Sequence, residues 1–295
     1  MTVTVQVPCS TSNLGSGFDT LGLALRLHNT LRVSRIARIG LSLGSCPAGA
    51  DPAKAKKLLT DAAELFFERQ SVKPFGLKVD LSGEVPVGRG LGASAIARVG
   101  MLCALNRLSG ACLSKLDLLE MALEAEGHPD NATPALFGGF TVAGKVQGAV
   151  RHFRFPVSSD LRFVTLIPSF EIDTEKARRL LPVSVSMVVA AHSLNRAALI
   201  SAAFAAGDCE SLRGLFDDRL HQPYRERLIP QLSAVIRAGE AAGAIGGWLS
   251  GSGSAIMCLT QHRADAVARA MQQQMTSSTV RILKPDAKGA IVRRA

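Results

Sequence analysis

Aromatic side chains are scarce in this sequence of 295 residues: they make up 5%, with one Trp and one Tyr. Proteins that bind single-stranded nucleic acid stack its bases on aromatic side chains, so base stacking is not expected as the main activity. Basic residues outnumber acidic ones by 34 to 24, yet no run of five or more basic residues occurs. The net charge of +10 suits anionic partners such as nucleotides, phosphorylated metabolites or nucleic acid.

Segments typical of membranes or oxidising compartments are also missing. The first eight residues, MTVTVQVP, lack the basic and then apolar pattern of a secretory signal. The longest apolar stretch, residues 183–206, contains His192, Asn195 and Arg196, and we predict a buried helix of a soluble protein rather than a membrane span. The six Cys show no CxxC spacing, which indicates reduced thiols in a cytoplasmic protein with no membrane partner.

The composition that is present favours a folded α+β protein. With 47% hydrophobic and 20% charged residues, the chain is not intrinsically disordered, and its length allows one large domain or two ordinary ones. The predicted elements do not alternate regularly, which disfavours a βαβ Rossmann sheet. We predict two α+β halves, residues 1–155 and 156–295, joined without a flexible linker.

Local signals place the main elements. Val3, Val5 and Val7 alternate with polar residues, which predicts a half-buried strand. Asp51 before Pro52 predicts a helix start, and Ser114 begins a capping box. Further strands are predicted at residues 31–36, 77–81, 162–167, 255–259 and, last in the chain, 280–283, and helices at 52–69, 93–108, 114–127, 174–181, 186–206 and 230–242.

A glycine-rich segment between a predicted strand and a predicted helix is the strongest local signal. It has the sequence PVGRGLGASA, residues 86–95, with Gly88, Gly90 and Gly92 at alternate positions. Glycine lets the backbone turn tightly, and a helix N-terminus offers free N–H groups to phosphate. The segment lacks both the GKS or GKT of a P-loop and the GxGxxG spacing of a dinucleotide fold. It is therefore either a phosphate site, with the Ser94 hydroxyl available to Mg²⁺, or a plain glycine-rich loop and helix cap.

A turn after the first strand carries two short polar side chains, Asn13 and Asp19. They could bind the ammonium or hydroxyl group of a small polar substrate. Asn and Asp are also common in turns for purely local reasons, so both interpretations remain open.

Residues 126–131, with the sequence EGHPDN, crowd polar side chains at the end of a predicted helix. Because Mg²⁺ takes one or two carboxylates beside phosphate and water, Glu120, Glu124 and Glu126 are candidate ligands. Glu120 and Glu124 share one helix face and could be solvated surface. His128 could equally be a structural cap.

Arginine side chains in two distant segments could recognise a carboxylate. Arg178 lies in TEKARR, residues 174–179, and Arg225 lies in HQPYR, residues 221–225. A guanidinium group binds a carboxylate through two parallel hydrogen bonds, although either arginine could be ordinary helix surface. A second glycine-rich segment, residues 246–254, could approach a substrate or nucleotide through its backbone.

Taken together and in this order, these segments resemble the GHMP kinase superfamily, which groups galacto-, homoserine, mevalonate and phosphomevalonate kinases. The three motifs shared by the superfamily lie at residues 12–19, 86–95 and 249–253. The segments similar to members that phosphorylate homoserine lie at residues 126–139, 173–182 and 218–230. The resemblance covers essentially the whole chain. It implies an N-terminal domain like the second domain of ribosomal protein S5, a ferredoxin-like C-terminal domain, and a homodimer.

The resemblance also implies a reaction: ATP-dependent phosphorylation of the side-chain hydroxyl of L-homoserine to O-phospho-L-homoserine, on the route to threonine. The loop that would wrap the ATP phosphates comprises Pro86, Val87, Gly88, Arg89, Gly90, Leu91, Gly92, Ala93, Ser94 and Ala95. The residues matching positions that hold homoserine are Asn13, Asp19, His128, Asn131, Thr174, Arg178 and Arg225, with Asn13, Asp19 and Asn131 also implied in catalysis. Ser94 and a glutamate, Glu126 in preference to Glu120, would bind Mg²⁺.

Three positions depart from the family pattern: Ala93 replaces a usual Ser, and Ser16 and Ser254 replace usual Pro residues. These changes suggest less rigid loops but remove no group of the implied chemistry. Mevalonate-kinase-like members place an aspartate base where this chain has Asn131, so the resemblance implies in-line transfer without a strong side-chain base.

Two alternatives to homoserine phosphorylation stay open at this point. One is a GHMP kinase for another small hydroxylated metabolite, and the other is a catalytically silent regulator that binds nucleotide or metabolite. A nucleic-acid partner rests on net charge alone and is not expected.

Overall fold

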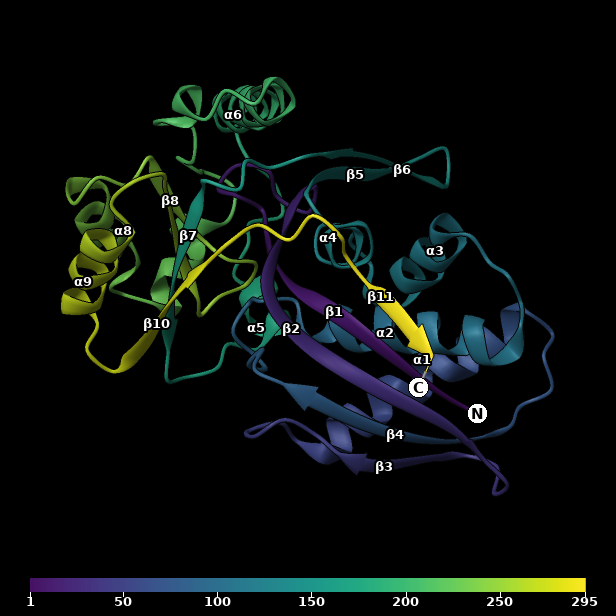
Figure 1. Cartoon of the computed structure of the whole chain (residues 1–295). Coiled ribbons are helices and arrows are strands. Elements are labelled where there is room, and N and C mark those ends of the chain that lie inside the picture. The colour runs from purple at the N-terminus through teal and green to yellow at the C-terminus, as the bar shows by residue number, and fades with distance from the viewer. Residues whose placement is uncertain (295) are drawn as a thin grey trace.

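Two β-sheets form the framework of the chain, of which the computed structural model describes residues 1–294. The larger sheet has the strand order β11-β1-β2-β4-β3, with β5 pairing with β2 and β6, and the smaller has the order β10-β7-β9-β8 (Figure 1). The strands are β1 (Thr2–Ser12), β2 (Leu21–Ile36), β3 (Leu41–Ser45), β4 (Gly76–Gly83), β5 (Phe140–Val146), β6 (Ala149–Phe155), β7 (Arg162–Pro168), β8 (Gly246–Leu249), β9 (Ile256–Thr260), β10 (Ser278–Leu283) and β11 (Ile291–Arg294).

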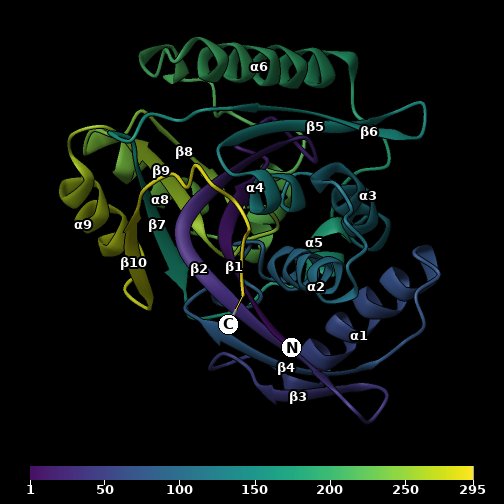
Figure 2. The same cartoon turned by 45° about the vertical axis from the view of Figure 1, so that its right-hand side comes forward.

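Helices cover one face of each sheet. The first four pack on the larger sheet, α8 and α9 pack on the smaller one, and α6 lies apart, over the hairpin of β5 and β6 (Figures 1 and 2). The helices are α1 (Pro52–Arg69), α2 (Ala93–Ser109), α3 (Lys115–Glu126), α4 (Ala132–Phe137), α5 (Thr174–Arg179), α6 (Met187–Ala206), α7 (Gln222–Arg225), α8 (Leu232–Ala241) and α9 (Ala264–Gln274), with short 3₁₀ turns at Glu210–Leu212 and Glu226–Leu228. The predicted α+β class is confirmed.

Three elements begin where local sequence signals place them. Val3, Val5 and Val7 of β1 are fully buried and alternate with partly exposed residues at positions 2, 4 and 6, which confirms the half-buried strand over this part of β1. The Asp51 side chain caps the N-terminus of α1, and Ser114 begins α3 in the predicted capping box. These short-range contacts form with little help from the rest of the fold.

A shared core joins the two sheets at their seam. Trp248 of β8 is fully buried, and its Nε1 donates a hydrogen bond to the Thr11 hydroxyl of β1 at 3.0 Å. Its ring stacks on Phe216, with a centroid distance of 4.6 Å. Because these contacts tie β8 to the end of β1, the smaller sheet is fixed against the larger one, in agreement with the predicted absence of a flexible linker.

A strand beyond residues 280–283 corrects the predicted order of elements. Strand β11 pairs antiparallel with β1, so the chain returns from the smaller sheet to the larger one. Asp286 holds the crossing segment, because its carboxylate accepts hydrogen bonds from His28 Nε2 at 3.0 Å and from the amides of Lys288 and Gly289 at 2.8 and 2.9 Å. The strand has only four residues and pairs with a strand from a distant part of the chain, which explains why its local sequence pattern does not reveal it.

Helix α6 corrects a second prediction. The apolar stretch 183–206 is predicted to be buried, but Met187 and Leu194 are 82% and 73% exposed. One side packs on the larger sheet, where the Phe204 ring stacks on Phe140 at 4.1 Å. Within residues 1–294, α6 is the one helix long and apolar enough to cross a membrane, yet this packing makes it part of the fold rather than a membrane span. The apolar composition of α6 predicts that its side chains are covered by other apolar groups. Within residues 1–294, only one side of α6 is covered in this way.

We expect Asp286→Ala to lower the free energy of unfolding at neutral pH by roughly 2–4 kcal/mol, since it removes a charged acceptor of three hydrogen bonds. Burial raises the pKa of Asp286, but the hydrogen bonds from His28 and the two amides outweigh burial and lower the pKa overall. The stabilisation is therefore present above the unfolded-state pKa of aspartate, about 4, and is lost as the pH falls through the lowered value.

Urea unfolding between about pH 7 and about pH 3 measures this effect. The gap between Asp286→Ala and the wild type should narrow in acid, while Asp160→Ala, which removes an exposed carboxylate, should match the wild type throughout. A gap that does not change with pH would contradict the assignment.

Candidate active site

The glycine loop, residues 86–95, runs into α2 and has the conformation that its sequence predicts. Gly88, Gly90 and Gly92 all have positive φ, at 67°, 72° and 70°. A Cβ on Gly90 would lie 2.0 Å from the carbonyl oxygen of Ser250, so only glycine fits there. No side chain caps α2 at Gly92, which leaves the first amides of this helix free to bind an anion.

A second glycine loop, residues 250–254, holds the first one from the side of the smaller sheet. The Ser250 hydroxyl donates to the Gly90 carbonyl at 2.7 Å and lies 2.9 Å from the Thr11 hydroxyl. The amide of Ala255 donates to the carbonyl of Arg89 at 3.0 Å. The backbone of the glycine loop is therefore fixed by the protein itself.

The Arg89 side chain is turned toward the end of β7. Its guanidinium group donates to the carbonyl oxygens of Pro168 and Ser169 at 3.0 and 2.9 Å. The backbone of the glycine loop, rather than this predicted side chain, is thus left to meet a phosphate.

Ser94 and Glu126 meet at the N-terminus of α2. The Ser94 hydroxyl donates to Glu126 Oε1 at 2.7 Å, and Glu126 Oε2 accepts a hydrogen bond from Arg98 at 2.8 Å. Glu120 is exposed on α3, and Glu124 forms a surface ion pair. Of the three carboxylates considered from the sequence, Glu126 is the one beside Ser94.

Asn13 and Asn131 are held by hydrogen bonds at the end of β1. Asn131 Oδ1 accepts from the Ser10 hydroxyl at 2.9 Å, and its Nδ2 donates to the Ser12 hydroxyl at 3.0 Å. Asn13 Oδ1 accepts from the amide of Asp19 at 3.0 Å, and its Nδ2 donates to a carbonyl of the second glycine loop. Both side-chain amides are therefore oriented before any ligand binds.

Asp19 and Arg178 form a two-bond ion pair across the seam. Arg178 Nη1 and Nη2 donate to the two carboxylate oxygens of Asp19 at 2.9 and 3.0 Å, and this hydrogen bonding raises the pKa of Arg178. Asp19 lies in the turn before β2, whereas Arg178 lies on α5. The Phe18 ring centroid is 5.5 Å from the guanidinium carbons of both Arg178 and Arg225, a distance at which the ring attracts each cation.

Arg225 is a buried cation with unused hydrogen-bonding capacity. It is 2% exposed, and its Nη1 donates to the Gly251 carbonyl at 2.9 Å. Its Nε has no partner within residues 1–294. Burial, together with the neighbouring charge of Arg178, lowers the pKa of Arg225 to about 10. An unpaired buried charge is costly, so an anionic group of a ligand would complete this site.

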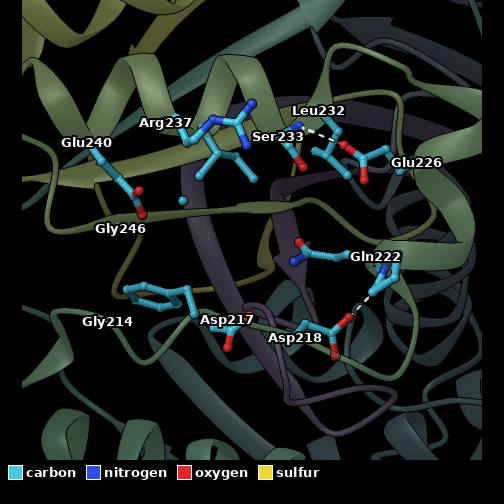
Figure 3. A pocket seen from close by; sticks show the side chains of 14 residues that line it. Gly214, Asp217, Asp218, Gln222, Glu226, Leu232, Ser233, Arg237, Glu240 and Gly246 are labelled. Atoms are coloured by element: carbon cyan, nitrogen blue, oxygen red, sulfur yellow. Dashed lines mark hydrogen bonds between the residues drawn. The ribbon is translucent and has the colours of Figure 1, made fainter.

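The short helix α7 sets the position of Arg225. Asp218 accepts hydrogen bonds from the amides of His221 and Gln222 at 2.9 and 2.7 Å, at the start of α7. Asp218 and Gln222 also line a cavity of about 370 Å³, together with residues of α8 and β8 (Figure 3). His221 is fully buried, which lowers its pKa. As the neutral form, it donates from Nε2 to the Gly15 carbonyl at 2.9 Å and accepts from Arg225 at Nδ1.

Asp130, which is hydrogen-bonded to His128, provides a second carboxylate near Asp19. His128 Nδ1 shares a hydrogen bond with Asp130 Oδ1 at 2.8 Å. Burial lowers the pKa of His128, but the hydrogen bond and the charges of Asp130 and Asp19 outweigh burial and raise it overall. Ligand atoms of Asp19, His128 and Asp130 lie within 4.8 Å of one another, a grouping that suits an ammonium group or a metal cation.

Thr174 and two of the departures from the family pattern fasten the surrounding loops. The Thr174 hydroxyl lies 3.2 Å from that of Ser252, so α5 reaches the second glycine loop. Ser16 and Ser254 stand where the family has Pro, and their hydroxyls donate to the carbonyls of Asp217 and Phe170, both at 2.7 Å. These bonds fasten both loops to neighbouring segments, and the reduced rigidity expected from the sequence stays a prediction.

The structure brings the predicted substrate residues together around the two glycine loops and leaves Glu120 outside. Sequence reasoning missed several contributors. They are Ser10, Ser12, Phe18, Arg98, Asp130 and His221. Phe18, Asp130 and His221 lie inside or beside motifs that the sequence already marks, whereas Arg98 lies in an apolar helical stretch and carries no motif.

Comparison with known proteins agrees with this geometry. The chain matches the family models "GHMP kinases N terminal domain" over residues 57–139 and "GHMP kinases C terminal" over residues 199–277. It is 37% identical to a homoserine kinase of Caldicellulosiruptor saccharolyticus, covering 98% of this chain and 96% of that one. It is 39% identical to a homoserine kinase of Trichormus variabilis, covering 98% of both chains. The crystal structure of a homoserine kinase from Cytophaga hutchinsonii superimposes with a TM-score of 0.89 at 27% identity, covering 99% of this chain and 97% of that one.

The chain therefore belongs to the GHMP kinases, a family of ATP-dependent kinases, and it has their two-domain α+β fold. Within that family it belongs with the homoserine kinases, to which it is similar over nearly its whole length.

We expect Gly90→Ala to weaken ATP binding at least about tenfold, because the added methyl group would collide with the Ser250 carbonyl and displace the loop. Gly110→Ala is the matched control, since Gly110 has a similar positive φ, 75° against 72° for Gly90, but no atom of the described residues lies within 4 Å of an added Cβ. It should cost only the roughly 1–2 kcal/mol of a left-handed backbone and keep its affinity. Calorimetric titration with a nonhydrolysable ATP analogue compares the two, and equal affinities would show that the loop tolerates a side chain.

Proposed function

We propose that the protein transfers the γ-phosphoryl group of ATP to the side-chain hydroxyl of L-homoserine, giving ADP and O-phospho-L-homoserine on the route to threonine. The observation that carries this proposal is a balanced set of charges beside the glycine loop, in which Asp19 and Asp130 accompany Arg178 and Arg225. A zwitterionic amino acid requires such a set, because carboxylates bind its ammonium group and guanidinium groups bind its carboxylate. The full-length similarity to homoserine kinases supports the same substrate.

Substrate binding would exchange the partners of the Asp19–Arg178 ion pair. The α-carboxylate of homoserine takes over Arg178 and the free Nε of Arg225, and the α-ammonium group takes over Asp19 beside Asp130. Each broken ion pair is thus replaced by an equivalent one, so a zwitterion enters without leaving a charge unpaired. A ligand that lacks either group would leave Asp19 or Arg178, whose side chains are 30% and 42% exposed, without its charge-assisted contact and would bind less well.

The ATP phosphates would bind the backbone amides at the N-terminus of α2. Mg²⁺ fits the adjacent pair Ser94 and Glu126, since it takes a hydroxyl and one carboxylate beside the phosphates of a substrate. When bound, the ion neutralises phosphate charge. Ala93 has no polar group, so Ser94 alone supplies the hydroxyl.

Catalysis would rest on positioning rather than on a strong base. Both ends of the Asn131 amide are hydrogen-bonded to serine hydroxyls, and an amide cannot serve as a base. With substrate bound, the Asp19 carboxylate would be engaged by the α-ammonium group rather than by Arg178. Phosphoryl transfer passes through a loose transition state that demands little deprotonation of the attacking hydroxyl. Asn13, Asp19 and Asn131 then align the hydroxyl in line with the γ-phosphate, and its proton leaves late.

An ADP-release assay with Mg-ATP tests the proposed substrate. L-Homoserine should be phosphorylated. Its analogues 3-aminopropan-1-ol, which lacks the carboxylate, and 4-hydroxybutanoate, which lacks the ammonium group, should each lose at least about 100-fold in kcat/KM. Turnover of mevalonate or galactose instead would assign the protein to another GHMP substrate, and no turnover despite ATP binding would indicate a regulator.

Arg178→Ala should raise the KM for L-homoserine by about 30- to 100-fold, because one charge-assisted contact contributes about 2–3 kcal/mol. The KM for ATP should stay nearly unchanged, and the preference for homoserine over 3-aminopropan-1-ol should shrink. Arg179→Ala is the matched control, since Arg179 follows on the same helix but pairs with the exposed Glu175. An equal rise in the KM for ATP would contradict the assignment of Arg178 to the carboxylate.

We also propose a cytoplasmic location and a division of the chain near residue 155. All six cysteines are free thiols, which suits a reducing compartment. Residues 1–155 carry the glycine loop. Residues 156–295 carry α5, α7 and the second glycine loop, although β11 returns to the larger sheet.

A homodimer formed through α6 is the proposed assembly. The exposed side of α6 carries Met187, Val188, Leu194 and Leu199, and His192 and Arg196 are the only titratable side chains on the helix. The chain has a net charge of +10, but these four apolar side chains are uncharged, so a contact between two copies through them would not place like charges directly against each other. Two such helices packed side by side would cover a strip about 30 Å long, and exposed Val183 and Val185 extend it toward the roughly 800 Å² per partner of a stable interface. A helix that lies on a membrane normally carries Lys and Arg along its polar face, so a second copy is the favoured partner.

Sedimentation velocity tests the dimer. The wild type should sediment as a dimer at about 10 μM, a usual working concentration for pairs with Kd in the micromolar range or below. Leu194→Glu should sediment as a monomer, because it places a charge in the contact. Ile39→Glu is the control, since Ile39 is comparably exposed, at 70%, but lies outside α6. A monomeric wild type, or a dimeric Leu194→Glu variant, would overturn the α6 interface.

A further inference from the structure

Arg98 is a half-buried cation at the N-terminus of α2 that the proposed reaction does not use. It lies one helical turn after Ser94, and its Nη1 donates to Glu126 Oε2 at 2.8 Å, while Ser94 donates to Glu126 Oε1 at 2.7 Å. The Arg98 and Glu126 side chains are only 18% and 6% exposed. Each oxygen of this carboxylate is therefore occupied by a donor from the same face of α2.

The surroundings of Glu126 explain why a cation is needed there. Glu126 is the last residue of α3, where the partial negative charge of the helix end disfavours a carboxylate. Burial disfavours it further. The Ser94 hydroxyl offers a hydrogen bond but no charge, so Arg98 alone supplies the counter-charge among the side chains that contact this carboxylate.

We propose that Arg98 is a positioning residue that acts as the resident counter-charge of Glu126 and makes metal binding depend on ATP. The inference rests on the proposed metal site at Ser94 and Glu126. By holding Oε2, Arg98 fixes the carboxylate with Oε1 toward Ser94. The same guanidinium charge repels a free divalent cation from a carboxylate that is already neutralised. The phosphates of ATP bring the negative charge that offsets this repulsion, so the metal enters together with the nucleotide.

A purely structural role is the competing interpretation, because the Arg98–Glu126 pair also joins α2 to α3. The two roles differ in what they predict for metal affinity. If Arg98 only joins helices, its loss loosens Glu126 and leaves metal binding unchanged or weaker. If Arg98 is the resident counter-charge, its loss strengthens the binding of a free metal ion.

Binding of Mn²⁺, measured by the electron paramagnetic resonance signal of the free ion without nucleotide, separates these roles. Arg98→Met removes the charge but keeps much of the side-chain volume, and it should bind Mn²⁺ about tenfold more tightly than the wild type. Arg98→Lys keeps the charge and should match the wild type. The gain should vanish in the double variant Arg98→Met, Glu126→Gln, because the carboxylate that Arg98 neutralises is gone.

The wild type provides a second test that does not depend on whether a variant folds. With a nonhydrolysable ATP analogue present, the wild type should bind Mn²⁺ at least about tenfold more tightly than the analogue alone does in buffer without protein. Without nucleotide, the wild type should bind Mn²⁺ weakly. Tight Mn²⁺ binding by nucleotide-free wild type would overturn the proposal, as would an Arg98→Met variant, folded by its melting temperature, that binds Mn²⁺ no more tightly. If instead Glu126→Gln leaves Mn²⁺ binding with the analogue unchanged, the metal site itself is misassigned, which is a separate failure.

Discussion

The contact between Ser250 and Gly90 is the constraint on which the site depends. The hydroxyl of Ser250 binds the carbonyl of Gly90, and its own carbonyl occupies the space where any other residue at position 90 would carry a Cβ. This contact joins the segment after β8 to the loop before α2, and Trp248 of β8 is hydrogen-bonded to Thr11 of β1. The end of β1, the start of α2 and the second glycine loop therefore meet at one place, although they come from distant parts of the chain. Every polar group assigned to substrate or nucleotide lies beside this junction.

Charge balance governs what the junction can bind. Asp19 and Arg178 neutralise each other across the seam, whereas the buried Arg225 has an Nε without a hydrogen-bond partner among residues 1–294. At the proposed metal site, Glu126 pairs with Arg98. Asp19 and Glu126 each have an arginine partner within the chain, so a ligand binds well there only if it replaces the partner that it displaces. Selectivity then follows from the arrangement of charges on the ligand as much as from its size or shape.

How far the sequence predicts this structure depends on the range of the interactions involved. Short-range signals succeed: Asp51 and Ser114 cap the helices they should, and the spacing of Gly88, Gly90 and Gly92 specifies the loop. Long-range pairings are less visible. Nothing in the local pattern says that Arg178 reaches Asp19 or that β11 returns to β1, because each contact joins residues far apart in the sequence. The resemblance to a family supplied the substrate residues, which residue chemistry alone left open between site and surface.

Two other residues show why composition is an incomplete guide. Apolar content correctly indicates that α6 needs a contact, but it does not say whether that contact lies within the chain, and Leu194 is exposed. Arg98 has the opposite problem, since a single basic residue in an apolar helix has no recognisable spacing. Its partner Glu126 becomes apparent only when α2 and α3 are packed together.

The strand order has a further consequence for how the chain is made. Strand β1 leaves the ribosome first, but one of its two neighbours, β11, is synthesised only after every other strand. Until β11 is synthesised, the edge of β1 at residues 3–6 lacks this hydrogen-bonding partner, so this segment of the nascent chain is open to strand-to-strand aggregation.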